Sequence, residues 1–384
     1  MSVFIHRLET VVPEHTSTQD VLAVQFGAWS GDPAMARIIR HVFRRTGINR
    51  RYSVVRDFVE TDRAELFRAD AEGQLVEPST QARNRVYGKR AGPMVVELAQ
   101  RLVDGRAGFG PQDVTHVITV SCTGFVNPGP DWNIVTELGL SPNVERYHLG
   151  FMGCYAALPA LRMAQQFCLA RPEAVVLIVC LELCSLHMQM RTDTDSILGN
   201  ALFSDGAAAA LVSAQSPVGD RPVLALDGFM SALAPEGRGE MAWEIGDRGF
   251  NLVLSSYVPD VIAANVGRIV HDLLAPRGLR RDDIDLWAVH PGGKAIIDKF
   301  EQSMTLDAQQ LEATRAVLRD FGNMSSATIL FVLQRMLNEP AAAPRTVAAM
   351  AFGPGLTIEC GLLEIVPARQ RVTKETNQFA AAAI

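Results

Sequence analysis

The sequence predicts an α/β protein built from two similar halves. Two strand-like segments, residues 113–121 and 283–290, each follow a helix and an acidic turn, and each then enters a loop. Two glycine turns that run into strands, at residues 203–213 and 352–363, repeat in the same order. Two matched pairs in one order indicate an internal duplication of a strand–turn–helix unit.

The length of the chain agrees with this organisation. Its 384 residues, 48% of them apolar, are enough for a large core in two domains or one duplicated unit. A break rich in proline and polar residues falls near residues 214–222. We therefore expect an N-terminal half at residues 1–220 and a C-terminal half at residues 221–384.

The first hundred residues are mostly helical in pattern. Residues 20–28 and 33–46 are expected to form helices, split at the Gly-Asp-Pro that begins at Gly31. Residues 61–80 are polar and are expected to be mostly loop. A long helix is predicted at residues 82–104.

Composition excludes several classes of function. The net charge of −6 argues against general nucleic-acid binding, which needs a basic face. The N-terminus has no charged start followed by a long apolar run, so no signal peptide is visible. The longest apolar stretches, such as residues 174–181 and 347–352, are too short to span a bilayer. We expect a cytoplasmic protein.

The six cysteines are expected to be free thiols. Their spacings along the chain show no regular pattern and no CxxC pair occurs, so disulfides and a zinc site are not indicated. No bound metal is predicted. They are Cys122, Cys154, Cys168, Cys180, Cys184 and Cys360.

Cys154 is the candidate nucleophile. A strand-like run ends in Gly153, Cys154 follows at once, and an Ala/Leu-rich helix comes next. Glycine permits a sharp turn, and a thiol at a helix N-terminus has its pKa lowered by the helix dipole. The alternative is that Cys154 is a small buried hydrophobic residue, as we expect for Cys168, Cys180 and Cys360.

Two polar residues in loops complete a chemical set. His290 closes a strand before Pro-Gly-Gly, where α/β folds expose functional groups. Asn323 lies between Gly322 and Met-Ser-Ser. Each alone could be structural, His290 against the sheet end and Asn323 as a turn residue. Together with Cys154 they can attack a thioester and hold a developing enolate between an imidazole and a carboxamide.

These motifs resemble the type III polyketide synthases, the chalcone-synthase-like enzymes. The resemblance rests on Gly153-Cys154, on His290-Pro-Gly-Gly, on Gly322-Asn323-x-Ser-Ser and on the Gly-Pro-Gly turn that follows Phe352. It covers residues 5–366. The last motif distinguishes the family from the ketosynthase that initiates fatty acid synthesis, which also uses cysteine, histidine and asparagine.

The resemblance implies a thiolase fold, in which duplicated halves form a five-layered αβαβα sandwich, and a homodimer. It implies that an acyl-CoA starter is loaded on Cys154 and extended with malonyl-CoA by decarboxylative condensation. It implies no permanently bound cofactor, with coenzyme A thioesters as substrates.

Further positions carry over from the family to this chain. Phe203 matches a gating phenylalanine, whereas the second gating phenylalanine is replaced by Leu252, which argues against bulky aromatic starters. Asn127 matches a loop residue that reaches into the partner subunit's cavity. The remaining positions expected to line the cavity are Cys122, Thr123, Cys184, His187, Trp243 and Ser325.

The expected coenzyme A contacts lie in two segments. A basic cluster of Arg40, Arg44, Arg45, Arg50 and Arg51 is the best local source of positive charge, although any one of these arginines could simply be solvated. By resemblance, Arg45 and, less closely, His41 match phosphate contacts. Gly293 and Ala295 are the expected contacts after the His290 loop.

Three functions remain open from the sequence. We favour a fatty acyl starter that ends as an alkylpyrone or alkylresorcinol, because Leu252 and the small Ala156 and Ala157 would leave room for an alkyl chain. The alternatives are a synthase of the tetrahydroxynaphthalene type that uses malonyl-CoA alone, and a ketosynthase that initiates fatty acid synthesis. The starter, the number of extensions and the cyclisation mode are not set by the sequence.

Overall fold

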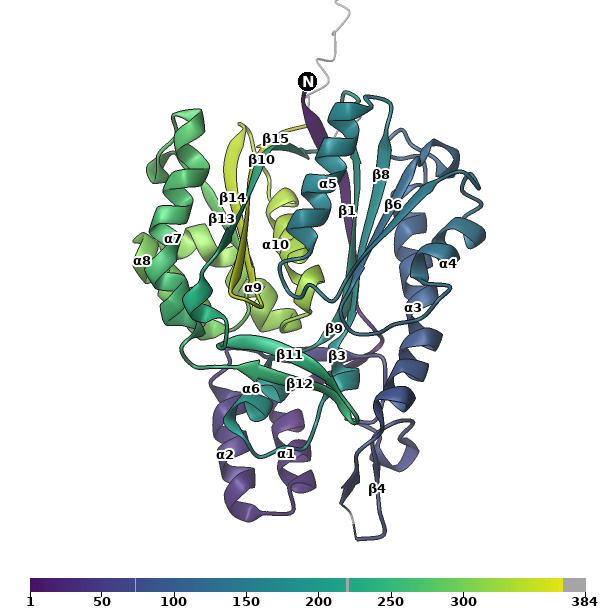
Figure 1. The fold of residues 1–384 in the computed structure, drawn as a ribbon, viewed down its shortest axis with the longest axis vertical. Coiled ribbons are helices and arrows are strands. Elements are labelled where there is room, and N and C mark those ends of the chain that lie inside the picture. Colours follow the sequence, from purple (N-terminus) through teal and green to yellow (C-terminus); the bar gives the residue numbers. More distant parts are fainter. Residues whose placement is uncertain (73, 219–220, 369–384) are drawn as a thin grey trace, which may run out of the picture.

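Two sheets face each other across a pair of helices in the computed structural model, which describes residues 1–72, 74–218 and 221–368 (Figure 1). Because the chain alternates strands and helices, each sheet must bury both of its faces. The strands of the first half are β1 (Val3–Val11), β6 (His116–Ser121), β7 (Glu145–Gly150), β8 (Val175–Leu183) and β9 (Asp205–Ser213). Those of the second half are β10 (Val223–Leu233), β13 (Leu286–Val289), β14 (Arg345–Gly353) and β15 (Thr357–Val366).

The two halves repeat one strand topology. In the first half β6 and β8 are parallel, β8 and β9 antiparallel, and β9 and β1 antiparallel. In the second half β13 and β14, β14 and β15, and β15 and β10 repeat the same three relations. This repeat confirms the predicted duplication. The halves meet where β1 pairs with β10 over three residue pairs, from Val3–Leu226 to Ile5–Leu224, which joins all nine strands into one continuous sheet.

Five layers follow from this arrangement. Helices α5 (Ala157–Ala170) and α10 (Thr328–Leu337) form the middle layer between the sheets. Helices α3 (Thr80–Leu102) and α4 (Pro130–Glu137) cover the first sheet from outside, and α7 (Val258–Leu274) and α8 (Lys294–Met304) cover the second. The predicted αβαβα sandwich is therefore confirmed.

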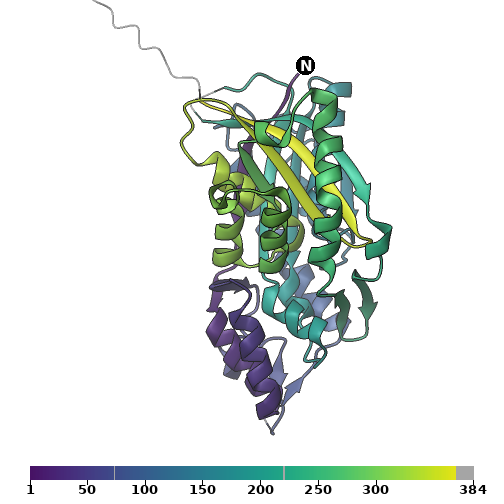
Figure 2. The ribbon, with the colours of Figure 1, turned by 90° about the vertical axis from the view of Figure 1, so that its left-hand side faces the viewer.

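Most of the remaining elements gather at one end of the molecule, away from the N-terminus (Figures 1 and 2). Helices α1 (Gln19–Trp29) and α2 (Pro33–Arg44) form the tip, and the hairpin of β11 (Met241–Gly246) and β12 (Gly249–Leu254) crosses the ends of both sheets. Helices α6 (Thr194–Leu202) and α9 (Glu312–Phe321) and the short strands β2 (His15–Thr18), β3 (Arg50–Ser53), β4 (Arg68–Ala69) and β5 (Leu75–Val76) complete the fold.

Most predicted elements occur within a few residues of their expected bounds. Helices α1, α2 and α3 match the three predicted N-terminal helices. The predicted strands at residues 113–121 and 283–290 are shorter, because their acidic starts form single 3-10 turns before β6 and β13. The expected boundary between the halves falls at residue 220, outside the described residues, and stays a prediction.

The burial of α5 gives a stability prediction. Leu161 is fully buried in the middle layer, whereas Leu169, on the same helix, is 42% exposed. We expect Leu161→Ala to lower the free energy of unfolding by about 2–5 kcal/mol, because it leaves a cavity between two sheets. Leu169→Ala should change it by about 0.5 kcal/mol or less. Urea denaturation of both variants measures the difference, and equal losses would contradict the layer assignment.

Candidate active site

The three predicted catalytic residues line one cavity, although they come from distant segments. Cys154 lies in the turn between β7 and α5, His290 directly follows β13, and Asn323 follows α9. The duplicated topology explains part of this convergence. The residues that directly follow the equivalent strands β6 and β13 are Cys122 and His290, and both reach the cavity at the carboxyl ends of the strands.

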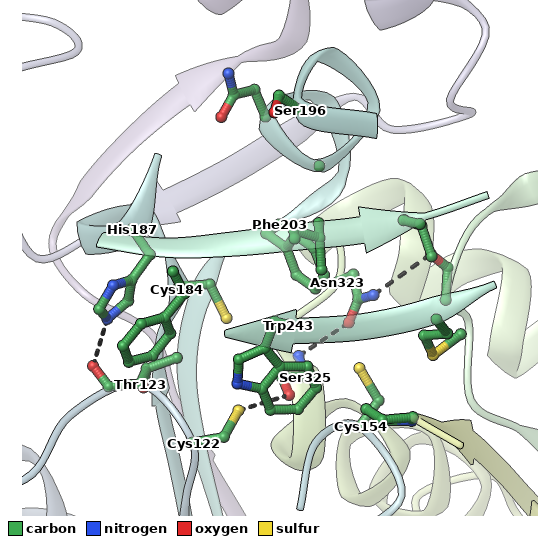
Figure 3. Close-up of a pocket in the computed structure, with 18 of the residues that line it drawn as sticks. Cys122, Thr123, Cys154, Cys184, His187, Ser196, Phe203, Trp243, Asn323 and Ser325 are labelled. Carbon is green, nitrogen blue, oxygen red and sulfur yellow. Dashed lines mark hydrogen bonds between the residues drawn. The ribbon is translucent and has the colours of Figure 1, made fainter. Parts of the chain in front are cut away.

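The turn at Cys154 depends on the glycine before it. Gly153 has φ +99°, and a Cβ there would lie 2.6 Å from the indole of Trp243. Glycine therefore provides both the left-handed conformation and the close approach of Trp243 to the cysteine. Figure 3 shows Cys154 beside Asn323 and Ser325 at the base of the cavity.

The expected lowering of the Cys154 pKa is wrong. Helix α5 begins only at Ala157, so Cys154 lies in a separate turn before the helix. Burial instead raises the pKa of the thiol to about 11, because an apolar cavity disfavours the thiolate. Hydrogen bonding from Ser325 and Asn323 opposes this increase without cancelling it. The thiol is therefore neutral at pH 7.

His290 is a buried, neutral imidazole. Its exposed fraction is 1%, and neither ring nitrogen has a hydrogen-bond partner within the described part of the chain. Burial lowers its pKa to about 3. An unpaired polar group in the interior is costly, so a ring with two free nitrogens indicates a site that binds a reacting group.

Asn323 has a fixed orientation. Its Oδ1 accepts a hydrogen bond from the backbone N–H of Ser325 at 2.9 Å. Because an N–H can only donate, the amide Nδ2 must point the other way, where its contact with the carbonyl of Gly292 is long, at 3.4 Å. Left-handed backbone at Gly322 (φ +74°) and Ser325 (φ +46°) shapes this loop. The side chain is therefore held as a hydrogen-bond donor.

Most of the residues predicted to form the cavity walls line the cavity of this chain. The cavity has a volume of about 120 Å³. Eight of the predicted wall residues line it: Cys122, Thr123, Cys184, His187, Phe203, Trp243, Leu252 and Ser325. Asn127 does not line it but is exposed on a surface loop. Ala156 and Ala157 face the core of the middle layer, so they do not make the room for an alkyl chain that we expected.

Two features of the site were not predicted from the sequence. Met241, Leu254 and Phe250 also line the cavity, and their period-2 alternation with Trp243 and Leu252 was the available signal. Glu182 is fully buried behind Cys122. It was visible as one carboxylate inside an apolar strand.

Glu182 is the centre of a buried hydrogen-bond network. It accepts the backbone N–H of Cys122 at 3.1 Å and the hydroxyl of Thr123 at 3.0 Å, and it also accepts the hydroxyl of Ser326. Burial raises the pKa of Glu182, and the same burial together with this carboxylate raises the pKa of the Cys122 thiol. The Cys122 thiol is therefore protonated and forms part of the cavity wall.

The expected coenzyme A residues lie near the cavity but do not line it. His41 and Arg45 are exposed at the end of α2, Ala295 is exposed, and Gly293 is buried. The two segments approach each other, because a Cβ at Gly47 would lie 3.6 Å from the side chain of Lys294. Gly292 and Ile296, on either side of Lys294, do line the cavity.

Arg51 does not belong to the predicted phosphate-binding cluster. Its exposed fraction is 2%, and its guanidinium donates to the carbonyls of Asn200 and Phe203. Packing of β3 against α6 buries the Arg51 side chain. The sequence shows only a run of basic residues, which does not reveal this burial. Among the described residues no group of three histidine, cysteine or acidic side chains could hold a metal ion.

The uncharged pair Cys154 and His290 gives a pH prediction. We expect His290→Asn to slow the alkylation of Cys154 by iodoacetamide about 100-fold at pH 7, because the imidazole is the base that takes the thiol proton. The deficit should shrink as the pH approaches the raised thiol pKa of about 11, where hydroxide ionises the thiol directly.

The measurement is the rate at which the Cys154 peptide gains mass. His187→Asn is the matched control, because His187 also lines the cavity but donates its Nε2–H to the carbonyl of Thr123. An unchanged rate at pH 7 in His290→Asn would exclude His290 as the base.

Comparison with known proteins agrees with this geometry. Residues 4–216 match the N-terminal domain of the chalcone and stilbene synthases, and residues 226–367 match the C-terminal domain. A relative named alpha-pyrone synthesis polyketide synthase-like Pks18, from Mycobacterium tuberculosis, is 33% identical over 368 residues, which covers 94% of this chain and 91% of the relative.

Solved structures with the same fold include two polyketide synthases. PKS-I from the brown alga Ectocarpus siliculosus has a TM-score of 0.87 at 29% sequence identity. The match covers 95% of this chain and 98% of the algal chain. The 1,3,6,8-tetrahydroxynaphthalene synthase of Streptomyces coelicolor, a bacterial type III polyketide synthase, has a TM-score of 0.83 at 28% sequence identity. The match covers 95% of this chain and 99% of the synthase chain. The chain therefore belongs to the chalcone and stilbene synthase family of type III polyketide synthases, which are decarboxylating acyltransferases.

Proposed function

We propose that this enzyme loads a fatty acyl group from coenzyme A on Cys154, extends it with malonyl-CoA, and closes the chain to an alkylpyrone or alkylresorcinol. The observation that carries the proposal is the convergence of Cys154, His290 and Asn323 on one apolar cavity. The name of the mycobacterial relative, which refers to alpha-pyrone synthesis, supports the product class.

Loading starts from two neutral groups. The thiol proton of Cys154 moves to a nitrogen of His290 as the sulfur attacks the thioester carbonyl. The coenzyme A thiolate leaves and takes the proton from the imidazolium, so the acyl-enzyme forms with His290 neutral again. The low basicity of His290 favours this return of the proton.

Extension uses the same two polar side chains as donors. The malonyl carboxylate leaves as carbon dioxide, and its electron pair becomes an enolate. The N–H of His290 and the Nδ2–H of Asn323 hydrogen-bond the enolate oxygen, and the carbanion carbon attacks the acyl thioester. The Cys154 thiolate leaves, and the longer chain returns to it from coenzyme A. An apolar cavity assists, because a poorly solvated carboxylate is destabilised relative to carbon dioxide.

Two segments support a coenzyme A site at the cavity mouth. The first segment carries His41 and Arg45 and leads to Gly47. The second carries Gly293 and Ala295, on either side of Lys294, and Gly47 approaches the side chain of Lys294. Arg40 and Arg50 are exposed and form no ion pair among the described residues, so both remain available for phosphates. A diphosphate and a 3′-phosphate need several such donors.

A homodimer accounts for a group of exposed aromatic residues. Phe125 and Trp132 are 44% and 46% exposed, and Asn127 lies between them on an exposed loop. Exposed aromatic side chains of this size are typical of protein interfaces. We propose that Asn127 meets the cavity of a partner subunit here. We also propose a cytoplasmic enzyme; no described helix has the length and apolarity needed to cross a membrane.

The starter can be identified directly. We expect labelled malonyl-CoA to give a labelled product only when a fatty acyl-CoA is added, with Cys154→Ala abolishing both the product and the acyl-enzyme in the intact-protein mass spectrum. Equal product from malonyl-CoA alone would favour the second candidate, a synthase of the tetrahydroxynaphthalene type, which the Streptomyces structure supports. Product from Cys154→Ala would exclude this nucleophile.

Asn323 is expected to act on decarboxylation more than on loading. Asn323→Ala should slow the release of carbon dioxide from malonyl-CoA about 100–1000-fold, because one enolate donor is lost. Acylation of Cys154, followed by mass, should change far less. Asn251→Ala is the matched control, since Asn251 also lines the cavity but lies on the hairpin. Equal losses in both steps would reject separate roles for the two donors.

A further inference from the structure

The strand that leads to His290 has one open edge. Among the described residues, β13 is the outermost strand of the nine-stranded sheet and pairs only with β14. Backbone groups of successive residues in a strand point to opposite edges. The N–H of His290 points toward β14, where it donates to the carbonyl of Met350 at 2.7 Å. The N–H and C=O of Val289, the preceding residue, therefore point to the open edge.

The side chain of Thr314 binds both backbone groups of Val289. Its hydroxyl accepts the N–H of Val289 at 3.1 Å and donates to the carbonyl of Val289, also at 3.1 Å. We call these two bonds the Val289 clamp, and they replace the bonds that a neighbouring strand would make. Thr314 is fully buried in the first turn of α9, so bulk water cannot compete for either bond. Without the hydroxyl, two buried backbone groups would lose their partner, which is costly.

The Val289 clamp lies one residue before the imidazole of His290. Neither ring nitrogen of His290 has a hydrogen-bond partner among the described residues, so no side-chain bond orients the ring. Its orientation therefore depends on packing and on the backbone that carries it. The clamp restricts that backbone on the side where no strand supports it. A displacement of about 1 Å in a catalytic group can cost about 100-fold in rate.

Helix α9 connects the Val289 clamp to the second proposed donor. Thr314 lies near the start of the helix, and Asn323 follows its end after Gly322. The backbone N–H of Asn323 donates to the carbonyl of Leu202 at 2.9 Å, so both ends of this segment are held. A helix has a fixed rise of about 1.5 Å per residue. The length of α9 therefore sets how far the clamp lies from Asn323.

We propose that Thr314 is a positioning residue, which keeps the imidazole of His290 within reach of the Cys154 sulfur through its two bonds to Val289. This inference rests on the proposed role of His290 as the base that takes the thiol proton. Thr314 does not line the active-site cavity, so it touches neither the substrate nor the sulfur. It acts only through the end of β13.

The first half of the chain offers a matched control. The hydroxyl of Thr115 accepts the N–H of Val175 at 2.9 Å and donates to its carbonyl at 3.1 Å, and it also contacts Nδ1 of His116 at 2.7 Å. Val175 is the first residue of β8, whereas Cys184, which follows the last residue of β8, lines the cavity. Thr115→Val therefore removes the same two backbone bonds at the far end of a strand.

The test measures the alkylation of Cys154 by iodoacetamide from the mass of its peptide. Thr314→Val keeps the volume of the side chain and removes the hydroxyl. We expect it to slow alkylation about tenfold at pH 7, because the base is misaligned. The deficit should narrow as the pH rises toward the thiol pKa of about 11, where hydroxide ionises the thiol directly.

Two further variants separate alignment from stability. Thr314→Ser keeps the hydroxyl and should stay close to the wild-type rate. Thr115→Val should keep the wild-type rate at pH 7, even where its thermal midpoint falls as much as that of Thr314→Val. In turnover, Thr314→Val should lower kcat and leave the KM for malonyl-CoA nearly unchanged, because alignment matters in the transition state.

Three results would reject the positioning of His290 by Thr314. The first is a wild-type rate at pH 7 in Thr314→Val. The second is an equal loss in Thr314→Val and Thr314→Ser, which would assign the effect to packing of the methyl group. The third is an equal loss in Thr115→Val, which would assign it to general destabilisation. If Thr314→Val does not fold, Thr314→Ala removes the hydroxyl without a branched side chain and has the same expected result.

His290→Asn separates this inference from the role on which it rests. A wild-type alkylation rate in His290→Asn would overturn the base and the positioning residue together. Slow alkylation in His290→Asn with a wild-type rate in Thr314→Val would overturn only the positioning residue, and His290 would remain the base.

Discussion

Burial of the cavity around Cys154 sets the charge states of the residues in the site. Burial holds the thiol and the imidazole of His290 in their neutral forms, with the thiol pKa raised to about 11 and the imidazole pKa lowered to about 3. In the proposed mechanism, charge then forms only when a substrate brings a carbonyl for the sulfur to attack. The same environment destabilises the malonyl carboxylate, so loading and decarboxylation depend on one physical property of the site.

The polar groups in this apolar space are held by the backbone. Asn323 is oriented by the N–H of Ser325, and left-handed residues at Gly322 and Ser325 form the loop that carries it. His290 has no hydrogen-bond partner for its ring among the described residues, so its position depends on burial at the end of β13. Packing of the middle layer between the two sheets therefore determines how well the donors are aligned.

The hairpin β11–β12 is the part of the fold most suited to setting substrate choice. It contributes one apolar face to the cavity and belongs to neither sheet, since its two strands pair only with each other. Changes at Trp243, Leu252 or Phe250 can therefore alter the shape of the cavity while the five layers remain. The three candidate catalytic residues lie beside the central sheets and helices, whereas the hairpin supplies a separate wall of the cavity.

The sequence alone determined the fold class and the duplication, and it predicted three catalytic candidates that line one cavity. Strand–turn–helix segments are local patterns. Cys154 and Asn323 each follow a glycine, and His290 lies two residues before one, so each candidate could be found without coordinates. Eight of the predicted wall positions also line the cavity. These results depend on short-range patterns and on motif resemblance, which a linear sequence contains.

Only the tertiary structure decided the charge states of the site residues and which side chains form the walls of the cavity. Desolvation of a group depends on all of its neighbours, which come from distant segments, so the expected low pKa of Cys154 was wrong. For the same reason Arg51, which lies in a run of arginines, proved to be buried against α6. Ala156 and Ala157 face the core because the register of α5 between the sheets directs them there. His187 and Phe250 lie 63 positions apart in the sequence, and only the packing of the hairpin onto the first half brings their rings into a stack.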